Sequence, residues 1–359
     1  MKHHKAAIVI SVAALCAGCA TNADSWRAEE TPAPPAAWAA ASELRGGAPS
    51  DWVASFQDAR LAQIINEAIA HNNDIQAAAE RLAAARNASR VRRADLIPTI
   101  DGQLNGSRNA IVVDPRTAAQ AGGGATAASR VYVNNFILGA QTQWELDLWG
   151  RLVDTTRAAY ADAAAARADF AATRLSVAGA AAQAWFDLIE ARLQRRLAER
   201  DLETQERSLR LVERRYDRGL SASLDLRLAR SALATSQATL TTRRQTEAEA
   251  ARALEILLGR YPRAEIEAVE VLPELRPLPG AGAPVEVLAR RPDLIAAENR
   301  LEAAGFRARA ARKELLPRIT LSASINGSGP DFGDVVDPNR LAGNLVAGLV
   351  QPLFRGGAI

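Results

Sequence analysis

The sequence predicts a mixed α and β fold in which a unit of two strands and a long helical hairpin occurs twice. The stretch from Trp149 to Arg218 contains no Pro and, past Gly150, a single Gly (Gly179), and it is rich in Ala, Arg, Leu, Glu and Gln. These residues lose little rotamer freedom in a helix, so the stretch predicts one helix of roughly 100 Å at about 1.5 Å per residue. An alternating, aromatic stretch from Phe136 leads directly into this helix, and a second copy of the surrounding pattern begins near residue 285.

The composition excludes several functional classes. Hydrophobic residues make up 48% of the 359 residues but aromatics only 5%, which suits closely packed Ala-rich helices better than a thick globular core. The net charge of +3 is too small to indicate nucleic-acid binding. Of the histidines and cysteines, only His71 lies beyond residue 19, so a catalytic triad or a zinc cluster is hard to assemble. We therefore expect no enzyme and no metal site.

Residues 1–18 predict a lipoprotein signal peptide. Two lysines precede a short apolar run, residues 6–15, and small residues then lead to Cys19, an ending that resembles the lipobox of bacterial lipoproteins. Cys19 would be the acylated residue, and ordinary secretion with cleavage nearby is the alternative. Residues 19–57 then form a lipidated N-terminal tether, which is rich in Pro and Ala from Thr31 to Ala41.

The helices of the first repeat are predicted within residues 58–97. They are two: a first helix that includes residues 61–69, and a second that runs from about Asp74 to Leu96 and is ended by Pro98. The apolar residues of the first helix recur at spacings of three and four and share one face: Leu61, Ile64, Ile65, Ala68 and Ile69.

A strand pair is predicted over residues 98–148. The first strand alternates weakly around residues 100–104 and is followed by a Gly/Ala/Asn loop, whereas the second alternates clearly from Phe136 to Trp149. Its apolar and aromatic residues face one way, and Gln141 and Gln143 face the other. This alternation fits either a soluble sheet or a membrane strand with lipid on one side and water on the other.

A long helical hairpin is predicted over residues 149–258, with Gly219 at its turn. An equatorial linker over residues 259–284 follows. Apolar residues at coiled-coil spacing form the seam of the hairpin. They are Leu175, Ala178, Ala182, Trp185, Ile189, Leu209, Val212 and Tyr216 on the outgoing helix, and Leu226, Leu233, Leu240 and Leu254 on the returning helix.

The second copy is predicted as a helix over residues 285–316 and a strand pair over residues 317–354, whose last strand runs over Leu341–Arg355. The interval from Asp74 to Pro98 recurs from Asp293 to Pro317. The copy stops at Ile359, where its long helix would begin, so we expect the chain to be C-terminally truncated. At the fixed offset the coinciding residues include Ala78 and Ala297, Arg81 and Arg300, Leu82 and Leu301, and Leu96 and Leu315.

Four motifs carry a resemblance to a known family: WELDLWGR at 144–151, YDRGLS at 216–221, ARRPDL at 289–294 and PLFRGG at 352–357. With the lipobox and the duplication, they make the sequence similar to the TolC-like outer-membrane factors, lipoprotein subgroup. The resemblance implies a mixed α and β membrane protein. Its homotrimer would form a twelve-stranded outer-membrane β-barrel, continued by a periplasmic α-helical barrel. An open sheet edge is not tolerated in lipid, and three protomers sharing one barrel would remove it.

The resemblance also assigns roles to individual residues. It implies diacylglycerol and palmitate on Cys19 and no other cofactor. It places the contact with a periplasmic adaptor at Gly219, Leu220 and Ser221 of the hairpin tip, and a candidate gate at Tyr216, Asp217 and Arg218.

The function that the resemblance implies is a passive channel of a tripartite efflux pump. Drugs or other small molecules would pass from a periplasmic adaptor and an inner-membrane RND-type transporter to the exterior. The protein would lie in the bacterial outer membrane, lipid-anchored and extending into the periplasm. The alternatives are a periplasmic adaptor, which lacks duplicated strand pairs, and a structural coiled-coil envelope lipoprotein, which leaves the alternating strands unexplained.

Overall fold

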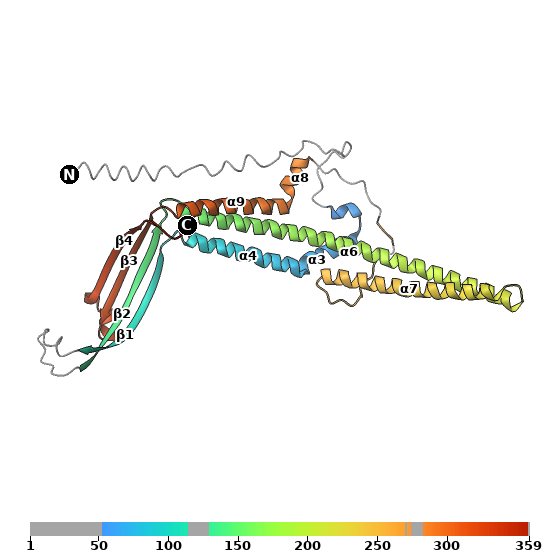
Figure 1. Cartoon of the computed structure of the whole chain (residues 1–359), viewed down its shortest axis with the longest axis horizontal. Coiled ribbons are helices and arrows are strands. Elements are labelled where there is room, and N and C mark those ends of the chain that lie inside the picture. The colour runs from blue at the N-terminus through green and yellow to red at the C-terminus, as the bar shows by residue number, and fades with distance from the viewer. Residues whose placement is uncertain (1–51, 114–128, 270, 274–282, 358–359) are drawn as a thin grey trace. The chain divides into compact units, whose positions relative to one another are not determined.

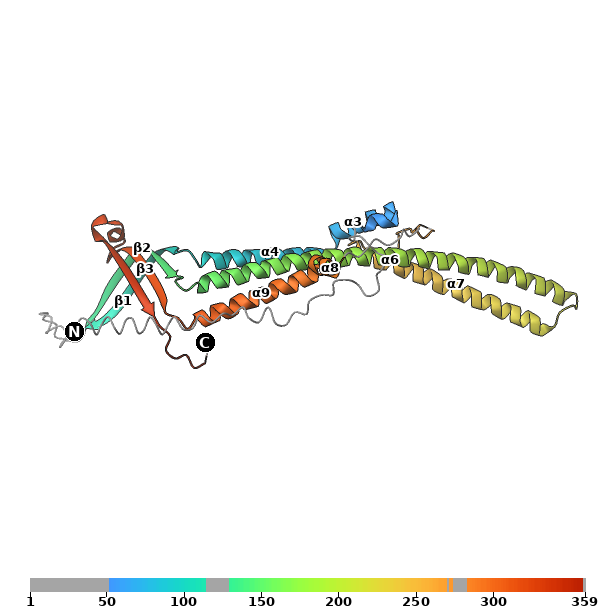
Figure 2. The ribbon, with the colours of Figure 1, turned by 90° about the horizontal axis from the view of Figure 1, so that it is seen from above.

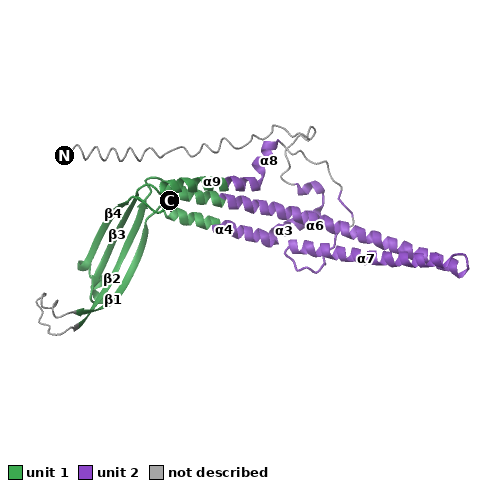
Figure 3. Cartoon of the chain, viewed as in Figure 1, with its two compact units in different colours: residues 1–31, 85–163, 300–359 green, residues 32–84, 164–299 purple. Residues whose placement is uncertain are grey.

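The computed structural model describes residues 52–113, 129–269, 271–273 and 283–357. The chain divides into two compact units (Figure 3). Unit 1 contains Ala85–Ala163 and Arg300–Ile359, and unit 2 contains Pro32–Ala84 and Ala164–Asn299. The predicted signal peptide, Cys19 and the Pro/Ala-rich part of the tether lie outside the described residues.

The core of unit 2 forms where helix α3 (Ala59–His71) packs against α6 (Arg151–Asp217) and the end of α7 (Ser223–Leu257). Asp58 caps α3, because its carboxylate accepts hydrogen bonds from two backbone N–H groups of the first turn. Its other oxygen accepts from Nε1 of the fully buried Trp185 at 2.9 Å. Of the predicted apolar face of α3, Leu61, Ile64, Ile65 and Ala68 are buried in this core and Ile69 is partly buried against it. The other helices contribute Trp185, Leu188 and Ile189 from α6 and Leu254 from α7.

The long hairpin of unit 2 consists of the distal part of α6 and of α7, which lie side by side in both views (Figures 1 and 2). The helix predicted from Trp149 to Arg218 is confirmed as α6. Polar pairs join the two helices, among them Ser236 Oγ, which donates to Asp201 Oδ2 at 2.8 Å. The predicted seam on α7 is confirmed: Leu226 and Leu233 are half-buried, and Leu240 and Leu254 are buried.

The predicted seam on α6 is wrong at two positions. Leu175 is 53% exposed because the side of the helix that faces the core at this point carries Val177 and Ala178. Tyr216 is 41% exposed because it lies in the last turn of α6, where the chain leaves the helix.

Unit 1 contains one four-stranded sheet, formed by β1 (Thr99–Val113), β2 (Ser129–Leu146), β3 (Arg318–Gly329) and β4 (Leu341–Val350). The strands lie in the order β1-β2-β3-β4, and every neighbouring pair is antiparallel (Figure 1). Residues pair one to one along each ladder, so no bulge shifts the register. The two predicted strand pairs are thus joined into a single sheet.

The strand ends differ from the prediction. Residues 105–113 continue β1 where a loop was expected, and β2 begins at Ser129 instead of Phe136, because these segments pair with each other residue by residue. The last strand ends at Val350 and does not reach Arg355. Pro352 has no N–H group to donate to a ladder, which favours an early end.

The helix predicted over residues 285–316 is two helices, α8 (Pro284–Arg290) and α9 (Pro292–Lys313). Arg291 has extended backbone angles between them, since a residue before proline disfavours the helical conformation. Helix α4 (Asn73–Ala94) confirms the helix predicted from about Asp74. The remaining elements are the short 3-10 helices η1 (Val53–Phe56), η2 (Phe332–Val336) and η3 (Pro338–Arg340).

Candidate functional site

The four-stranded sheet has one polar face. Residues that pair directly across neighbouring strands share a face, because successive side chains along a strand alternate between the two faces. Three successive rows on one face carry mostly Gln, Ser, Asn, Thr and Asp. The rows are Thr99–Gln143–Ser322–Val346, Asp101–Gln141–Ser324–Asn344 and Gln103–Gly139–Asn326–Ala342.

The opposite face of the sheet is apolar, and it is exposed in its middle, whereas η2 covers its end at Gly327 and Gly329. Several of its side chains are large and exposed: Ile100 is 79% exposed and Leu345 is 72% exposed. Continuous apolar surface of this kind marks an interaction with a partner or a membrane. The rows on this face are Leu104–Leu138–Gly327–Leu341, Gly102–Ala140–Ile325–Gly343, Ile100–Thr142–Ala323–Leu345, Trp144–Leu321–Ala347 and Leu146–Ile319–Leu349.

The apolar face spans a defined length of strand. It extends along β2 from Phe136 to Leu146, ten residue steps, over which β2 pairs with β3 without interruption. At about 3.4 Å per residue this distance is about 34 Å. A strand tilted by roughly 40° would cover about 26 Å along the perpendicular, close to the apolar band of about 25 Å in outer-membrane barrels.

A side-chain bridge crosses the polar face above a central glycine. Gln103 Nε2 on β1 donates to Asn326 Oδ1 on β3 at 3.2 Å, and Gly139 of β2 lies between them in the same row. A Cβ atom at Gly139 would collide with Asn326 Oδ1 and with the Ile325 carbonyl. Because Gly139 has no side chain, the side chains of β1 and β3 can form a hydrogen bond across β2.

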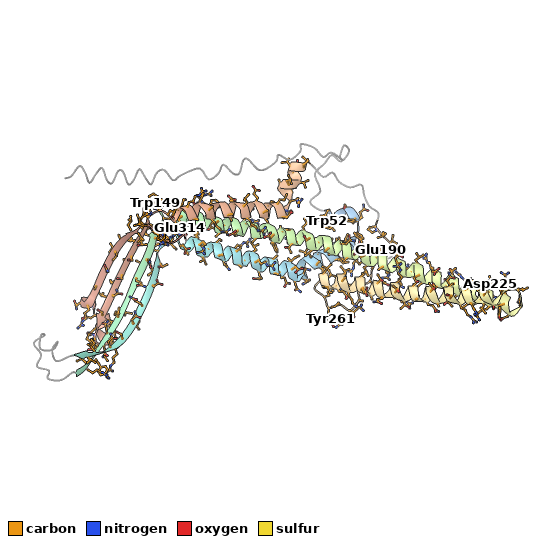
Figure 4. All side chains as sticks on the ribbon, viewed as in Figure 1. Trp52, Trp149, Glu190, Asp225, Tyr261 and Glu314 are labelled. Carbon is orange, nitrogen blue, oxygen red and sulfur yellow. The ribbon has the colours of Figure 1, made fainter. Side chains whose placement is uncertain are left out.

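Hydrogen bonds and an ion pair join the ends of the strands and helices within unit 1. Trp149 Nε1 donates to the Pro317 carbonyl at 2.7 Å, and Trp149 is labelled at this junction in Figure 4. Asp154, in the first turn of α6, is only 2% exposed, and its Oδ2 accepts from Lys313 Nζ of α9 at 2.6 Å. The same ammonium group donates to the Gly150 carbonyl at 3.1 Å. A buried carboxylate with a charged partner thus fixes the start of α6 to the end of α9.

The hairpin tip contains all six residues predicted there, and the structure places them in one turn. Leu220 N–H donates to the Arg215 carbonyl and Gly219 N–H to the Tyr216 carbonyl, both at 2.8 Å, which is the Schellman arrangement of a helix end. Gly219 has a φ of +72°, a left-handed conformation that favours glycine. Asp217 and Arg218 occupy the last helical position and the position after it, and both are exposed.

Asp225, which the sequence reasoning missed, orders the start of α7 (Figure 4). Its Oδ2 accepts from Ser221 Oγ at 2.9 Å and from Ala222 N–H at 3.2 Å. The Ser221–Asp225 spacing at the start of a helix could have indicated it.

An exposed leucine stripe, also missed, extends the tip along α7. Leu224 and Leu228 lie one turn apart on the same side of α7, Leu220 lies in the turn before that helix, and each of the three is at least 60% exposed. We call these three residues the tip stripe. It gives the tip an apolar surface beside the polar turn at Ser221.

The described residues offer no group of His, Cys, Asp and Glu side chains that could hold a metal ion. Within the same ranges, none of the helices combines the length and the apolar character needed to cross a membrane. The two-faced sheet and the hairpin tip are surfaces of the kind that assembly with a partner or a membrane uses.

The sequence is similar to a known family model and to known proteins. The family model described as "Outer membrane efflux protein" matches residues 64–260 and 283–359. The chain is 30% identical over 320 residues to the pyoverdine export outer membrane protein OpmQ of Pseudomonas aeruginosa, covering 89% of this chain and 65% of that protein. It is 28% identical over 309 residues to the cation efflux system protein CusC of Escherichia coli, covering 85% of this chain and 64% of that protein.

A solved structure of the outer-membrane channel OprN superposes with a TM-score of 0.77 at 26% identity. The match covers 89% of this chain and 71% of that one. The mixed α and β fold with strand pairs and a long helical hairpin is therefore the fold of these channels. The chain spans just under two thirds of the length of the two curated relatives above.

Proposed function

The chain belongs to the outer membrane efflux protein family, and on that premise we propose that it forms the outer-membrane channel of a tripartite efflux pump. The channel would conduct drugs or other small molecules passively to the exterior, with no chemistry of its own. Its driving force would come from an inner-membrane transporter of the RND type, through a periplasmic adaptor.

The two-faced sheet is the observation that carries this proposal. An apolar face of membrane height opposite a face of Gln, Ser and Asn is what a barrel needs when lipid lies outside and water inside. A periplasmic adaptor or a tethering coiled coil would have no use for an apolar strand face about 26 Å high whose middle, at Ile100, Ile325 and Leu345, is exposed, because exposed apolar surface costs free energy in water.

Three copies of the chain would close the barrel. The outer edges of β1 and β4 carry unpaired backbone groups within the described sheet, and such edges are not tolerated in lipid. Strand directions alternate across the sheet, so β4 of one copy can pair antiparallel with β1 of the next. Twelve strands then form a closed, even-numbered barrel, and the polar rows line its lumen.

The hairpin tip would meet the adaptor. Gly219, Leu220 and Ser221 form the turn, and the tip stripe adds apolar area that can be buried against a partner helix. Tyr216, Asp217 and Arg218 lie in the last turn of α6 and would contribute a charged constriction, since rings of charged side chains select ions at pore necks.

A lipid on Cys19 would anchor the chain to the outer membrane, as the lipoprotein signal predicts. The test is labelling of cells with radioactive palmitate. Wild type should incorporate the label and Cys19→Ser should not, whereas Cys16→Ser should label like wild type. Label retained on Cys19→Ser would contradict the assignment.

Two measurements test the channel itself. Deleting the gene should make cells more sensitive to drugs or detergents, and the wild-type gene should restore resistance. The protein should also sediment with the outer membrane and migrate on unheated gels as a trimer that dissociates on heating. Unchanged sensitivity under several inducing conditions, with a monomer in the periplasmic fraction, would refute the proposal in favour of an adaptor or a tether.

A further inference from the structure

The end of the sheet that meets the helices is oblique. Thr99, the first residue of β1, lies in one row with Val346 of β4, yet β4 continues four residues further toward the helices, to Val350. Tilted strands in a closed barrel have this stagger, because each strand then starts further along the rows than the one before it. The stagger predicts that β1 of the next copy starts beside Val350.

The registers that keep the two faces of the sheet continuous between copies differ by two residues. Setting Thr99 opposite Gly348 would draw Pro98 into the ladder, although proline is disfavoured in a sheet without an edge. Setting Thr99 opposite Val350 pairs every residue of β4 with one of residues 99–108, and we call this the matched register. The next register, two residues further along, would leave the first two residues of β1 without partners.

The tilt of the strands agrees with the matched register. Each copy then shifts the rows by four residues, so a ring of three shifts them by about twelve, or about 41 Å at about 3.4 Å per residue. Around twelve strands about 4.8 Å apart, that shift corresponds to a tilt of about 35°, whereas the next register corresponds to about 47°. Outer-membrane barrels have tilts of about 35–45°, which favours the matched register.

Side-chain pairs across the interface also favour the matched register. It sets exposed apolar side chains of β4 opposite those of β1, so that each covers the other on the apolar face. The next register would set the same leucines opposite glycines, which have no side chain to cover them. The pairs are Ile100–Leu349 and Leu104–Leu345 in the matched register, and Gly102–Leu349 and Gly106–Leu345 in the next one.

The matched register brings the outer end of β4 beside Arg108 of the next copy. Leu341, the first residue of β4, is then opposite Arg108, and both lie on the apolar face. Helix η2 lies on that face as well, because a Cβ atom at Gly327, the β3 partner of Leu341, would collide with the Val335 carbonyl. Arg108 would therefore lie on the same side of the barrel wall as η2 and η3 of its neighbour.

The segment that contains η2 and η3, residues 331–340, is acidic. It has three aspartates and one arginine, a net charge of −2. The arginine, Arg340, is shared between two of them: its Nη2 lies 3.3 Å from Asp334 Oδ1, and its Nε lies 3.9 Å from Asp337 Oδ2. Among the described residues of the same chain, no carboxylate pairs with Arg108. Neighbouring copies thus offer opposite charges to each other.

We propose that the copies join in the matched register, and that the Asp337 carboxylate of one copy pairs with the Arg108 guanidinium of the next and holds that register at the outer end of the barrel. This inference rests on the proposed function. Asp337 Oδ1 already accepts from the Asn339 N–H group at 2.9 Å, so Oδ2 is the oxygen left for Arg108. A slip of two residues would move Arg108 by about 7 Å along the strand and part the two charges.

Disulfide cross-linking tests the register on the polar face. Asn105→Cys with Asn344→Cys joins residues that are opposite in the matched register, whereas Ser107→Cys with Asn344→Cys joins residues that are opposite in the next one. Residues 105 and 344 lie on the two outermost strands of the sheet, so their disulfide must link two copies (Figure 1). After mild oxidation of outer-membrane vesicles, we expect the first pair to migrate as two and three linked chains on denaturing gels, and the second to match Asn344→Cys alone. Equal or stronger linking of the second pair would overturn the register.

Unheated gels of the reduced samples separate failure of this inference from failure of the proposed function. If wild type forms no trimer, the channel proposal fails and the interface with it. If wild type forms a trimer and neither pair cross-links in an assembled variant, only the register is refuted. Gln103→Cys with Val346→Cys, which are also opposite in the matched register, replaces the first pair if that variant does not assemble.

Heat dissociation of the trimer tests the ion pair in a double-mutant cycle. Arg108→Gln and Asp337→Asn should each lower the temperature at which the trimer dissociates, and the variant with both should dissociate no lower than the weaker single variant. The asparagine keeps an oxygen for the Asn339 N–H group. The control is Arg130→Gln, which lies beyond the residues that β4 pairs with, so its effect should add to that of Asp337→Asn. Single variants that dissociate like wild type, or losses that add for Arg108→Gln and Asp337→Asn, would overturn the ion pair.

Discussion

Charge placed on the apolar face of the sheet tests the membrane assignment most directly. Ile325 lies in the row Gly102–Ala140–Ile325–Gly343, close to the middle of the apolar band, and it is 51% exposed. Its sequence neighbour Ser324 lies on the polar face, opposite Gln141 and Asn344. Ile325→Arg and Ser324→Arg therefore add the same charge at the same depth on opposite faces.

The expected magnitude follows from that position. An arginine facing lipid at the bilayer midplane destabilises a barrel by about 2–4 kcal/mol. At about 1.4 kcal/mol per factor of ten, each copy of Ile325→Arg loses about 30-fold to 700-fold in its folding equilibrium. Three copies in one barrel would lose about 6–12 kcal/mol. Ser324→Arg adds its charge to hydrated surface and should change stability by no more than about 0.5 kcal/mol.

Trimer assembly and unfolding measure this difference. The fraction migrating as a heat-modifiable trimer in outer-membrane preparations should fall for Ile325→Arg and stay near wild type for Ser324→Arg. Urea titration of both proteins in lipid vesicles should place the midpoint of Ile325→Arg well below the other. Equal loss in the two variants, or a larger loss in Ser324→Arg, would show that the face carrying Ile325 is not the lipid face.

Three further predictions concern the helices. Gly219→Ala should destabilise the hairpin by about 1–2 kcal/mol in thermal unfolding, because a residue with a Cβ atom disfavours the φ of +72° found at this position, even though no atom crowds it. The control is Gly179→Ala, in the middle of α6 and also uncrowded, which should not destabilise the hairpin. Asp154→Asn should cost about 2–3 kcal/mol by leaving the Lys313 ammonium without its buried partner, and Lys313→Met in the same chain should recover part of that loss in chemical unfolding. Burial raises the pKa of Glu255, but backbone N–H groups of residues 264 and 265 donate to its carboxylate at 2.8 and 2.7 Å and hold that pKa below its ordinary value. The stability from Glu255 is thus present above its unfolded pKa and is lost as pH falls through the lower folded pKa, so Glu255→Gln should be less stable at neutral pH and show a smaller drop in acid.

Local composition and periodicity were sufficient to predict α3 and α6 as helices. The Ala- and Leu-rich composition of residues 149–218 and the spacing of Leu61, Ile64 and Ile65 depend only on neighbours three and four positions away, and α6 and α3 follow them. The position of Gly219 at the turn is equally local, because few residues other than glycine adopt its backbone angles without strain. The duplication was also visible in sequence, since it is a comparison of the chain with itself.

The ends of the strands and the exposed leucines at the hairpin tip were predicted less well. Residues 105–113 were expected to form a loop because Asn, Gly and Ser are common in turns, yet they pair with β2 throughout. The side of α7 that carries Leu224 and Leu228 follows a helical spacing that was visible, but its exposure depends on which side of α7 faces α6.

The sequence by itself determined which segments are helices, that two strand pairs occur, and that Gln141 and Gln143 oppose an aromatic face. These properties come from short-range periodicity, which the chain carries locally. Only the tertiary structure decided that β2 pairs with β3 across the intervening helices and that Asp154 meets Lys313. Each of these depends on register between segments far apart in sequence, because a shift of one residue would exchange the two faces of every strand.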